Sequence, residues 1–290
     1  MTVIRRRLVP YFLLGPGLIW LILFFVVPMY FMGRVSLEEG SAISGEFQFT
    51  WHFANFSDTL SEFDTQFLRS FWYAGIATLL ALVIAYPLAY MIAFRGGRFR
   101  NALLFAVIAP FFTTYLIRTL AWQTILGDTG VIVDTFKTLG LLGNDGRLLD
   151  TPGSVIAGLT YNFLPFMILP IYASLERFDE SLIEAAKDLY ASARQAFWKV
   201  TLPISSPGIV AGVLLTFIPA VGDYINADFL GSQNQAMIGN VIQSQFLVVR
   251  NYPSAAALSF VLMALIFVVV VIYIRFAGSE ALMGEEARKA

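Results

Sequence analysis

Six long stretches of apolar residues divide this 290-residue chain, and they constrain its fold more than any other feature. A helix needs roughly 20 mainly apolar residues to cross the ~30 Å of hydrocarbon in a bilayer. Hydrophobic residues make up 58% of the chain and charged residues 13%, whereas a soluble domain has about 45–50% and about 25%. We therefore predict an all-α membrane protein with a single transmembrane domain over residues 1–290. Its six expected spans are 11–33, 67–94, 102–126, 153–175, 208–230 and 254–276.

The first apolar stretch follows Arg5, Arg6 and Arg7, as the apolar part of a signal peptide follows a basic segment. Its apolar run is long, however, and no small-residue cleavage site follows it closely. Five more apolar stretches come after it. We therefore expect this stretch to be retained as the first span.

The lysines and arginines are distributed unevenly between alternate loops. If the N-terminus is cytoplasmic, 13 of the 19 fall on the cytoplasmic side, five on the other side, and Arg118 within a span. Cytoplasmic loops of membrane proteins carry the excess of these residues. The bias predicts that both termini are cytoplasmic. The cytoplasmic segments are 1–10, 95–101, 176–207 and 277–290, with Arg275 at the last boundary.

The composition also excludes several kinds of chemistry. Without cysteine, the chain has no disulfide, no thiolate metal site and no cysteine nucleophile. Its single histidine, His52, falls in a polar loop, where we expect a solvated side chain. No G-x-x-x-x-G-K-[ST] phosphate-binding loop occurs, so any ATPase must be a separate polypeptide. We expect no metal, no cofactor and no enzymatic activity, and the net charge of −1 gives no argument for nucleic-acid binding.

Residues 176–207 form the longest of the loops expected in the cytoplasm. Apolar side chains recur there at the spacing of one helical face, which predicts an amphipathic helix at roughly residues 182–199 that ends before Pro203. Lipid headgroups, the protein's own span ends or a groove on a partner would each cover this stripe, and the residues alone leave the three open. The stripe consists of Leu182, Ala186, Leu189, Ala193 and Phe197.

The same loop carries a spaced motif. Glu184-Ala185-Ala186 is followed by Tyr190 and then by Val200-Thr201-Leu202-Pro203. This arrangement resembles the pattern E-A-A, three residues, G, nine residues, I-x-L-P of binding-protein-dependent ABC importer permeases, with Tyr for Gly and Val for Ile. The resemblance implies a coupling element docked on a cytoplasmic ATPase, and we interpret Tyr190 as continuing the helix where glycine would bend it. The coupling residues implied are Glu184, Ala185, Ala186, Leu189, Tyr190, Leu202 and Pro203.

Further short strings, in collinear order, resemble those of the spermidine/putrescine-type permeases. This resemblance implies import of polyamines across the bacterial inner membrane by alternating access. It also implies two ATPase subunits, a second permease subunit (identical or homologous) and an extracytoplasmic binding protein. Import of another small solute is an alternative, as is an ATPase-independent secondary transporter or channel, which would not need the exposed stripe. The strings are 110–113, 117–122, 162–167, 175–176, 218–224, 238–240, 242–243 and 245–246.

Arg118 and Asp223 are charged residues that lie at matched depths within predicted spans. A charge at the bilayer centre costs roughly 2.5–3.5 kcal/mol on insertion scales, so such residues normally face the bundle or an aqueous path. Three interpretations stay open: an Arg118–Asp223 ion pair, presentation of Asp223 and Asp228 to a cationic substrate, or an Arg118 that extends outward. Aromatic faces attract ammonium groups, although tyrosine and tryptophan near span ends are often interface anchors. The candidate pathway residues are Arg118, Trp122, Tyr161, Asp223, Tyr224 and Asp228, with Asn226 beside them.

Overall fold

The structure is a computed structural model, and the chain forms two compact units. Among the described residues, five helices are long and apolar enough to cross a membrane, or six if one bent pair counts as a single span. The expected start of the first span, at residue 11, lies outside the described residues. The units are residues 1–64 with 242–263, and residues 65–241 with 264–290. The described residues are 14–43, 45–140, 142–143, 145–179 and 181–277.

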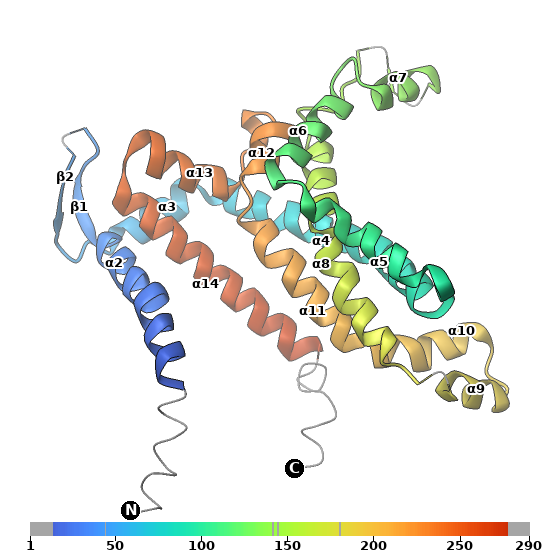
Figure 1. The fold of residues 1–290 in the computed structure, drawn as a ribbon. Helices are drawn as coiled ribbons and strands as arrows, with labels where there is room; N and C mark the ends of the chain where they lie inside the picture. The colour runs from blue at the N-terminus through green and yellow to red at the C-terminus, as the bar shows by residue number, and fades with distance from the viewer. Residues whose placement is uncertain (1–13, 44, 141, 144, 180, 278–290) are drawn as a thin grey trace, which may run out of the picture. The chain divides into compact units, whose positions relative to one another are not determined.

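In the first unit an apolar helix over Leu14–Val35 leads into a β-hairpin (Figure 1). The hairpin strands pair antiparallel, with Glu38 opposite Phe49. Asn55 Nδ2 donates to the carbonyl oxygens of Ser36 and Glu38, both at 2.9 Å, which fixes the base of the hairpin. The elements are η1 (Ile22–Val26), α2 (Val27–Val35), β1 (Glu38–Ser41), β2 (Glu46–Phe49), α3 (Ala54–Glu62) and η6 (Gln245–Val249), with the first half of α14 (Tyr252–Ala277).

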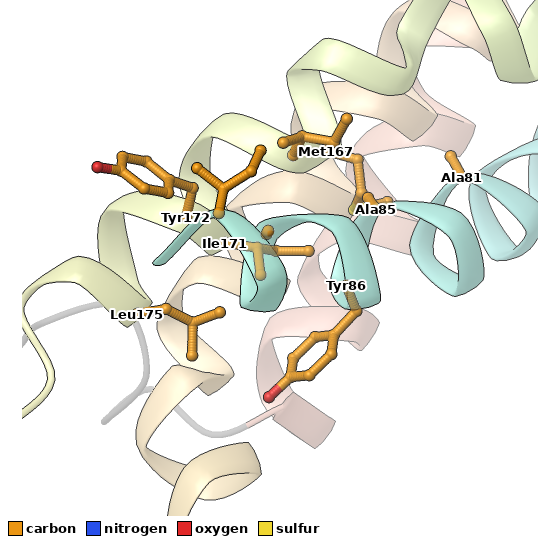
Figure 2. Close-up of a cluster of buried hydrophobic side chains, with 10 residues drawn as sticks. Ala81, Ala85, Tyr86, Met167, Ile171, Tyr172 and Leu175 are labelled. Carbon is orange, nitrogen blue, oxygen red and sulfur yellow. The ribbon is translucent and has the colours of Figure 1, made fainter. Parts of the chain in front are cut away.

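Three long helices build the core of the second unit: α4 (Asp64–Arg95), α8 (Pro152–Glu176) and α11 (Leu202–Val221). Because lipid is as apolar as a helix surface, membrane helices associate through close packing, and small residues allow the backbones to approach. Figure 2 shows α4 residues Ala81 and Ala85 in one buried cluster with Met167 and Ile171 of α8. The buried alanines of α4 are Ala74, Ala77, Ala81, Ala85 and Ala89.

Helices α8 and α11 lie side by side, and two glycines on α11 bring their backbones together (Figure 1). A Cβ atom added at Gly208 would lie 2.5 Å from the carbonyl oxygen of Pro170 and 2.6 Å from Ser174 Cβ. One added at Gly212 would lie 2.8 Å from Met167 Sδ. The spacing of four residues places both glycines on one face of the helix, as in other small-residue helix contacts.

The third apolar stretch is not the continuous helix expected over 102–126. Its two halves, 97–112 and 115–138, meet at an angle of 94°. Pro110 lacks a backbone N–H, which weakens the helix at that point, and Thr113 and Thr114 are extended, with ψ of 140° and 147°. The elements are η2 (Gly97–Phe99), α5 (Arg100–Ile108), η3 (Ala109–Phe112), α6 (Tyr115–Leu126) and α7 (Val131–Thr138).

The fifth stretch differs from its prediction at both ends. Residues 193–221 form one uninterrupted helix of 29 residues, so the prediction that Pro203 ends a helix is wrong. The π-turn η4 (Phe197–Thr201) precedes Pro203 and accommodates its missing N–H. The helix ends at Val221 rather than at residue 230, and three short elements follow. They are α12 (Ile225–Leu230), η5 (Gln233–Gln235) and α13 (Ile238–Ser244).

The single helix expected over 182–199 is instead divided between α9 (Ser181–Asp188) and α10 (Ala193–Ala196), which is the first turn of the helix over 193–221. Tyr190 separates them with φ of +59°, so the interpretation that it continues the helix is wrong. Its N–H donates to Lys187 O at 2.8 Å, and the Ala191 N–H donates to Ala186 O at 3.0 Å. These two bonds form a Schellman motif, whose left-handed position is usually glycine.

The glycine contact between α8 and α11 makes a first prediction. Gly208→Ala should destabilise the protein by about 1–3 kcal/mol, because the new methyl group overlaps a carbonyl oxygen and a side chain. Thermal unfolding in detergent measures the loss. Gly75→Ala on α4 is the matched control, since a Cβ there meets no atom within 4 Å. Equal midpoints for the Gly208 variant and the wild type would contradict the close contact.

The backbone of Tyr190 makes a second prediction. Tyr190→Gly should stabilise the fold by up to ~1–2 kcal/mol, because glycine adopts positive φ without the clash of a Cβ atom. Tyr190→Ala also removes the ring but keeps the Cβ atom, so it should give no such gain. Thermal unfolding of the three proteins side by side tests the idea, and a lower midpoint for the glycine variant would refute it.

Candidate functional site

A cluster of polar side chains is centred on Asp223 in the second unit. The helix α11 ends at Val221, and Asp223 lies in the turn that leads into α12. The Tyr115 hydroxyl, at the start of α6, donates to Asp223 Oδ2 at 2.5 Å. The backbone N–H and the side-chain Nδ2 of Asn226 donate to Asp223 Oδ1 at 2.8 Å and 3.2 Å. The buried carboxylate of Asp223 therefore has three donors directed at it.

Further hydrogen bonds connect Asn226 to α6 and α8. Asn226 Nδ2 also donates to the Tyr115 hydroxyl oxygen at 2.6 Å. Asn162 Nδ2 donates to Asn226 Oδ1 at 3.1 Å and to Thr119 Oγ1 at 3.3 Å. We call these five residues, from three helices and one turn, the Asp223 cluster: Tyr115, Thr119, Asn162, Asp223 and Asn226.

Arg118 is buried next to this cluster without joining it. It lies one turn after Tyr115 on α6, and its side chain is 8% exposed. Its guanidinium carbon lies 5.5 Å from the centre of the Tyr115 ring and 5.6 Å from that of Phe111. Its Nε and Nη1 atoms are buried, and neither has a hydrogen-bond partner in the part of the chain that the structure describes. Two aromatic faces, rather than a carboxylate, therefore hold this cation.

The interpretation of Arg118 and Asp223 as an ion pair is wrong for this structure. Among the described residues, the Asp223 oxygens accept from Tyr115 and Asn226, while the Arg118 guanidinium lies against the rings of Tyr115 and Phe111. The interpretation in which Arg118 extends outward is wrong as well, since its side chain is buried.

The remaining pathway candidates form two separate contacts. Trp122 and Tyr161 pack edge to face, with ring centres 5.4 Å apart. Asn240 Nδ2 donates to Asp228 Oδ1 at 2.8 Å and to the carbonyl oxygen of Tyr224 at 2.9 Å. The side chains of Tyr224 and Asp228 are exposed. The structure thus joins Asp228 to Tyr224 through Asn240.

The second candidate site is the loop after α8. Arg100 fixes the point where this loop begins: its Nη2 lies 2.5 Å from Glu176 Oε1, and its Nε donates to the Tyr172 hydroxyl at 2.6 Å. At the start of α9, the hydroxyl and backbone N–H of Ser181 bond to Asp179 and hold the pKa of that carboxyl below its usual value.

The predicted coupling residues lie in two separate elements of this loop. Five of them are exposed and two, on α9 and α11, are half-buried. The exposed ones are Glu184, Ala185, Leu189, Tyr190 and Pro203, and the half-buried ones are Ala186 and Leu202.

Four members of these contacts were not among the predicted site residues: Tyr115, Thr119, Asn162 and Asn240. The first three lie in otherwise apolar helices, where a tyrosine or threonine is unremarkable in sequence. Asn162 carried a usable signal, because an amide inside a membrane helix needs a partner. Charge drew attention to Asp223, and Asn226 was named beside it, but nothing in the sequence identified Tyr115 as a hydrogen-bond donor to Asp223.

Comparison with known proteins gives concordant results. Residues 85–278 match the family described as binding-protein-dependent transport system inner membrane component. The chain is 38% identical to the spermidine/putrescine transport system permease protein PotB of Haemophilus influenzae, over 88% of this chain and 90% of that protein. It is 37% identical to PotB of Escherichia coli K12, over 88% and 93% of the two chains.

A solved structure has the same fold. It is that of a bacterial alginate ABC transporter in complex with an alginate pentasaccharide-bound periplasmic protein. One of its chains is 20% identical to this one and superposes with a TM-score of 0.72, covering 97% of this chain and 98% of the other. The chain belongs to the family of binding-protein-dependent transport system inner membrane components.

Proposed function

We propose that this chain is the permease subunit of an ATP-driven importer that carries polyamines across the inner membrane by alternating access. The observation that carries the proposal is the 38% identity, over 88% of the chain, to a spermidine/putrescine permease. The buried carboxylate of Asp223 is consistent with a cationic cargo. Uptake of labelled spermidine and putrescine by cells that lack other polyamine importers tests it. Absence of saturable uptake when the complete importer is present would refute it.

The proposed topology has six spans, with both termini in the cytoplasm and one transmembrane domain over residues 1–290. The bent pair 97–112 and 115–138 serves as the third span. Irregular backbone is tolerated at membrane depth where it lines a cavity or is buried in protein. The Asp223 cluster beside the bend supports this role, because polar side chains of α6, α8 and the turn before α12 find their hydrogen-bond partners in one another.

The proposed partners are two cytoplasmic ATPase subunits, a second permease subunit and an extracytoplasmic binding protein. A separate ATPase is required because the chain has no phosphate-binding loop. The family description includes a binding protein, and the alginate transporter structure contains a periplasmic protein. Loop 176–207 is the proposed docking site for the ATPase. Its motif from Glu184 to Pro203 has the family spacing, and most of those side chains are exposed.

In the proposed pathway, Asp223 and Asp228 accept ammonium groups of the substrate. Asp223 already accepts three hydrogen bonds from neutral donors, which an ammonium group would replace or extend. Trp122, Tyr161 and Tyr224 offer aromatic faces, each worth ~0.5–2 kcal/mol to a cation. One observation favours a different cargo: the unpartnered nitrogens of Arg118 would suit an anionic solute. Uptake of labelled spermidine in the presence of unlabelled acidic solutes distinguishes a cationic from an anionic cargo, because only a shared site lets the acidic solutes reduce that uptake.

Asp223→Asn tests the substrate site. Uptake at limiting spermidine should fall about tenfold or more, because a hydrogen bond to a charged group contributes about 1.5–3 kcal/mol. Stability should change little, because the amide oxygen can still accept from Asn226 while the amide nitrogen donates to the Tyr115 hydroxyl oxygen. Adding Arg118→Gln should not restore uptake. Uptake and melting are measured together, with Asp134→Asn on the exposed face of α7 as control. Normal uptake by Asp223→Asn would eliminate the substrate role.

Glu184→Lys tests the docking site. The variant should insert normally, whereas pull-down of the ATPase and substrate-stimulated ATP hydrolysis should both fall. Reversing a charge at a docked surface costs about 2–5 kcal/mol where the opposing charge is buried. Asp134→Lys makes the same reversal on α7, away from the loop, and should leave both measurements unchanged. Wild-type values for Glu184→Lys would sink the docking role.

A further inference from the structure

The C-terminal end of α9 presents an unusual pair of side chains. Tyr190 occupies the left-handed position of the Schellman motif, with φ of +59°. An L-residue pays roughly 1–2 kcal/mol for this conformation, which is why glycine predominates there. Tyrosine therefore imposes a cost at a position where the family motif has the residue that avoids it.

Among the described residues, no packing contact of the Tyr190 side chain offsets this cost. The Tyr190 side chain is 97% exposed and that of Leu189 is 82% exposed, so neither is packed on the loop itself. Strained residues are retained where the surroundings or a function demand them. Tyrosine is also enriched among the residues that dominate protein–protein binding, because it offers a large rigid contact area with few rotatable bonds. The strain and the exposure together indicate a binding role for the ring.

The charge around this pair favours a protein over a lipid surface. Segment 179–190 contains four carboxylates and one ammonium, a net charge of −3: Asp179, Glu180, Glu184, Lys187 and Asp188. The cytoplasmic leaflet is anionic and attracts basic segments, so it repels this one. A protein groove with lysine or arginine at its rim and an apolar floor complements both the charge and the exposed side chains.

We propose that Leu189 and Tyr190 form an apolar plug that enters a basic-rimmed pocket on the cytoplasmic ATPase and makes this chain selective for that ATPase. The inference rests on the proposed function, which supplies the ATPase as the partner of this loop. It adds a residue-level determinant: the ring of Tyr190, in place of glycine, carries binding energy that a glycine-containing loop lacks.

The affinity of the full-length chain in detergent for the purified ATPase of the same importer tests the proposal. Tyr190→Gly and Tyr190→Asn both suit positive φ but remove the ring, and each should weaken binding at least about tenfold. Tyr190→Phe keeps the ring and should stay within about threefold of the wild type. Thermal unfolding of the same samples should show Tyr190→Gly at least as stable as the wild type. Weaker binding by a more stable variant is a result that a purely structural role does not give.

Photo-crosslinking identifies the occupant directly. Benzoylphenylalanine at position 190, in cells that contain the whole importer, should crosslink to the ATPase, identified by its mass and its peptides. The same probe at position 136, on α7, should not. Crosslinks from position 190 to lipid or to a second copy of this chain would overturn the proposal.

The plug and the proposed function can be refuted separately. If Glu184→Lys abolishes ATPase binding while Tyr190→Gly and Tyr190→Asn bind as the wild type does, the plug is refuted and the proposed function stands. If the wild-type chain does not bind the ATPase at all, both are refuted.

Discussion

Close approach of helix backbones is the constraint on which the second unit depends. Lipid is as apolar as the side chains, so moving a side chain from lipid into a helix contact gives no hydrophobic free energy. The helices are therefore held together by close packing and by hydrogen bonds between them. Gly208 and Gly212 allow α11 to touch the backbone of α8, and the buried alanines of α4 give that helix an equally smooth face. Bulkier residues at these positions would separate the helices and with them the polar groups that they position.

The Asp223 cluster lies where two of the packed helical segments are interrupted. Where α11 stops at Val221 and where the third apolar stretch bends, backbone and side-chain polar groups need partners inside the protein. Tyr115 and Asn226 supply them to Asp223, and Asn162 links them to α8. Arg118 is then left to two aromatic faces. A carboxylate and a guanidinium thus lie in one unit without neutralising each other directly.

Sequence predicted the long helices well, because length and apolarity decide whether a segment suits a bilayer. The expected span 153–175 corresponds to Pro152–Glu176, and 254–276 to Tyr252–Ala277. It did not predict the bend near Thr113, since apolarity continues through it and Pro110 was the only local signal. The motif has glycine at the position of Tyr190, which indicates a break in the helix. Because tyrosine is compatible with a helix, we predicted a continuous one there.

For the candidate site, sequence found the charges but not their contacts. Matched depth gives the position of a residue along the membrane normal but not its position in the membrane plane. The matched depths of Arg118 and Asp223 therefore did not establish an ion pair. Asn226, a donor to Asp223, is only three residues away in sequence, but Tyr115 and the Asn162 that bonds to Asn226 come from distant helices, and only the packing of those helices selects them. The roles of the pathway and loop residues remain predictions.

The uninterrupted helix over 193–221 has a mechanical consequence. At 1.5 Å per residue, 29 helical residues have a contour length of roughly 43 Å, which includes the π-turn η4 and the interior prolines Pro207 and Pro219. The helix begins three residues after Tyr190 and ends two residues before Asp223. A tilt of about 10° about one end would displace the other by roughly 7 Å, more than the rise of one helical turn. If the helix moves as a rigid body, it acts as a lever arm, and a small rotation at the loop becomes a displacement large enough to rearrange side chains around Asp223.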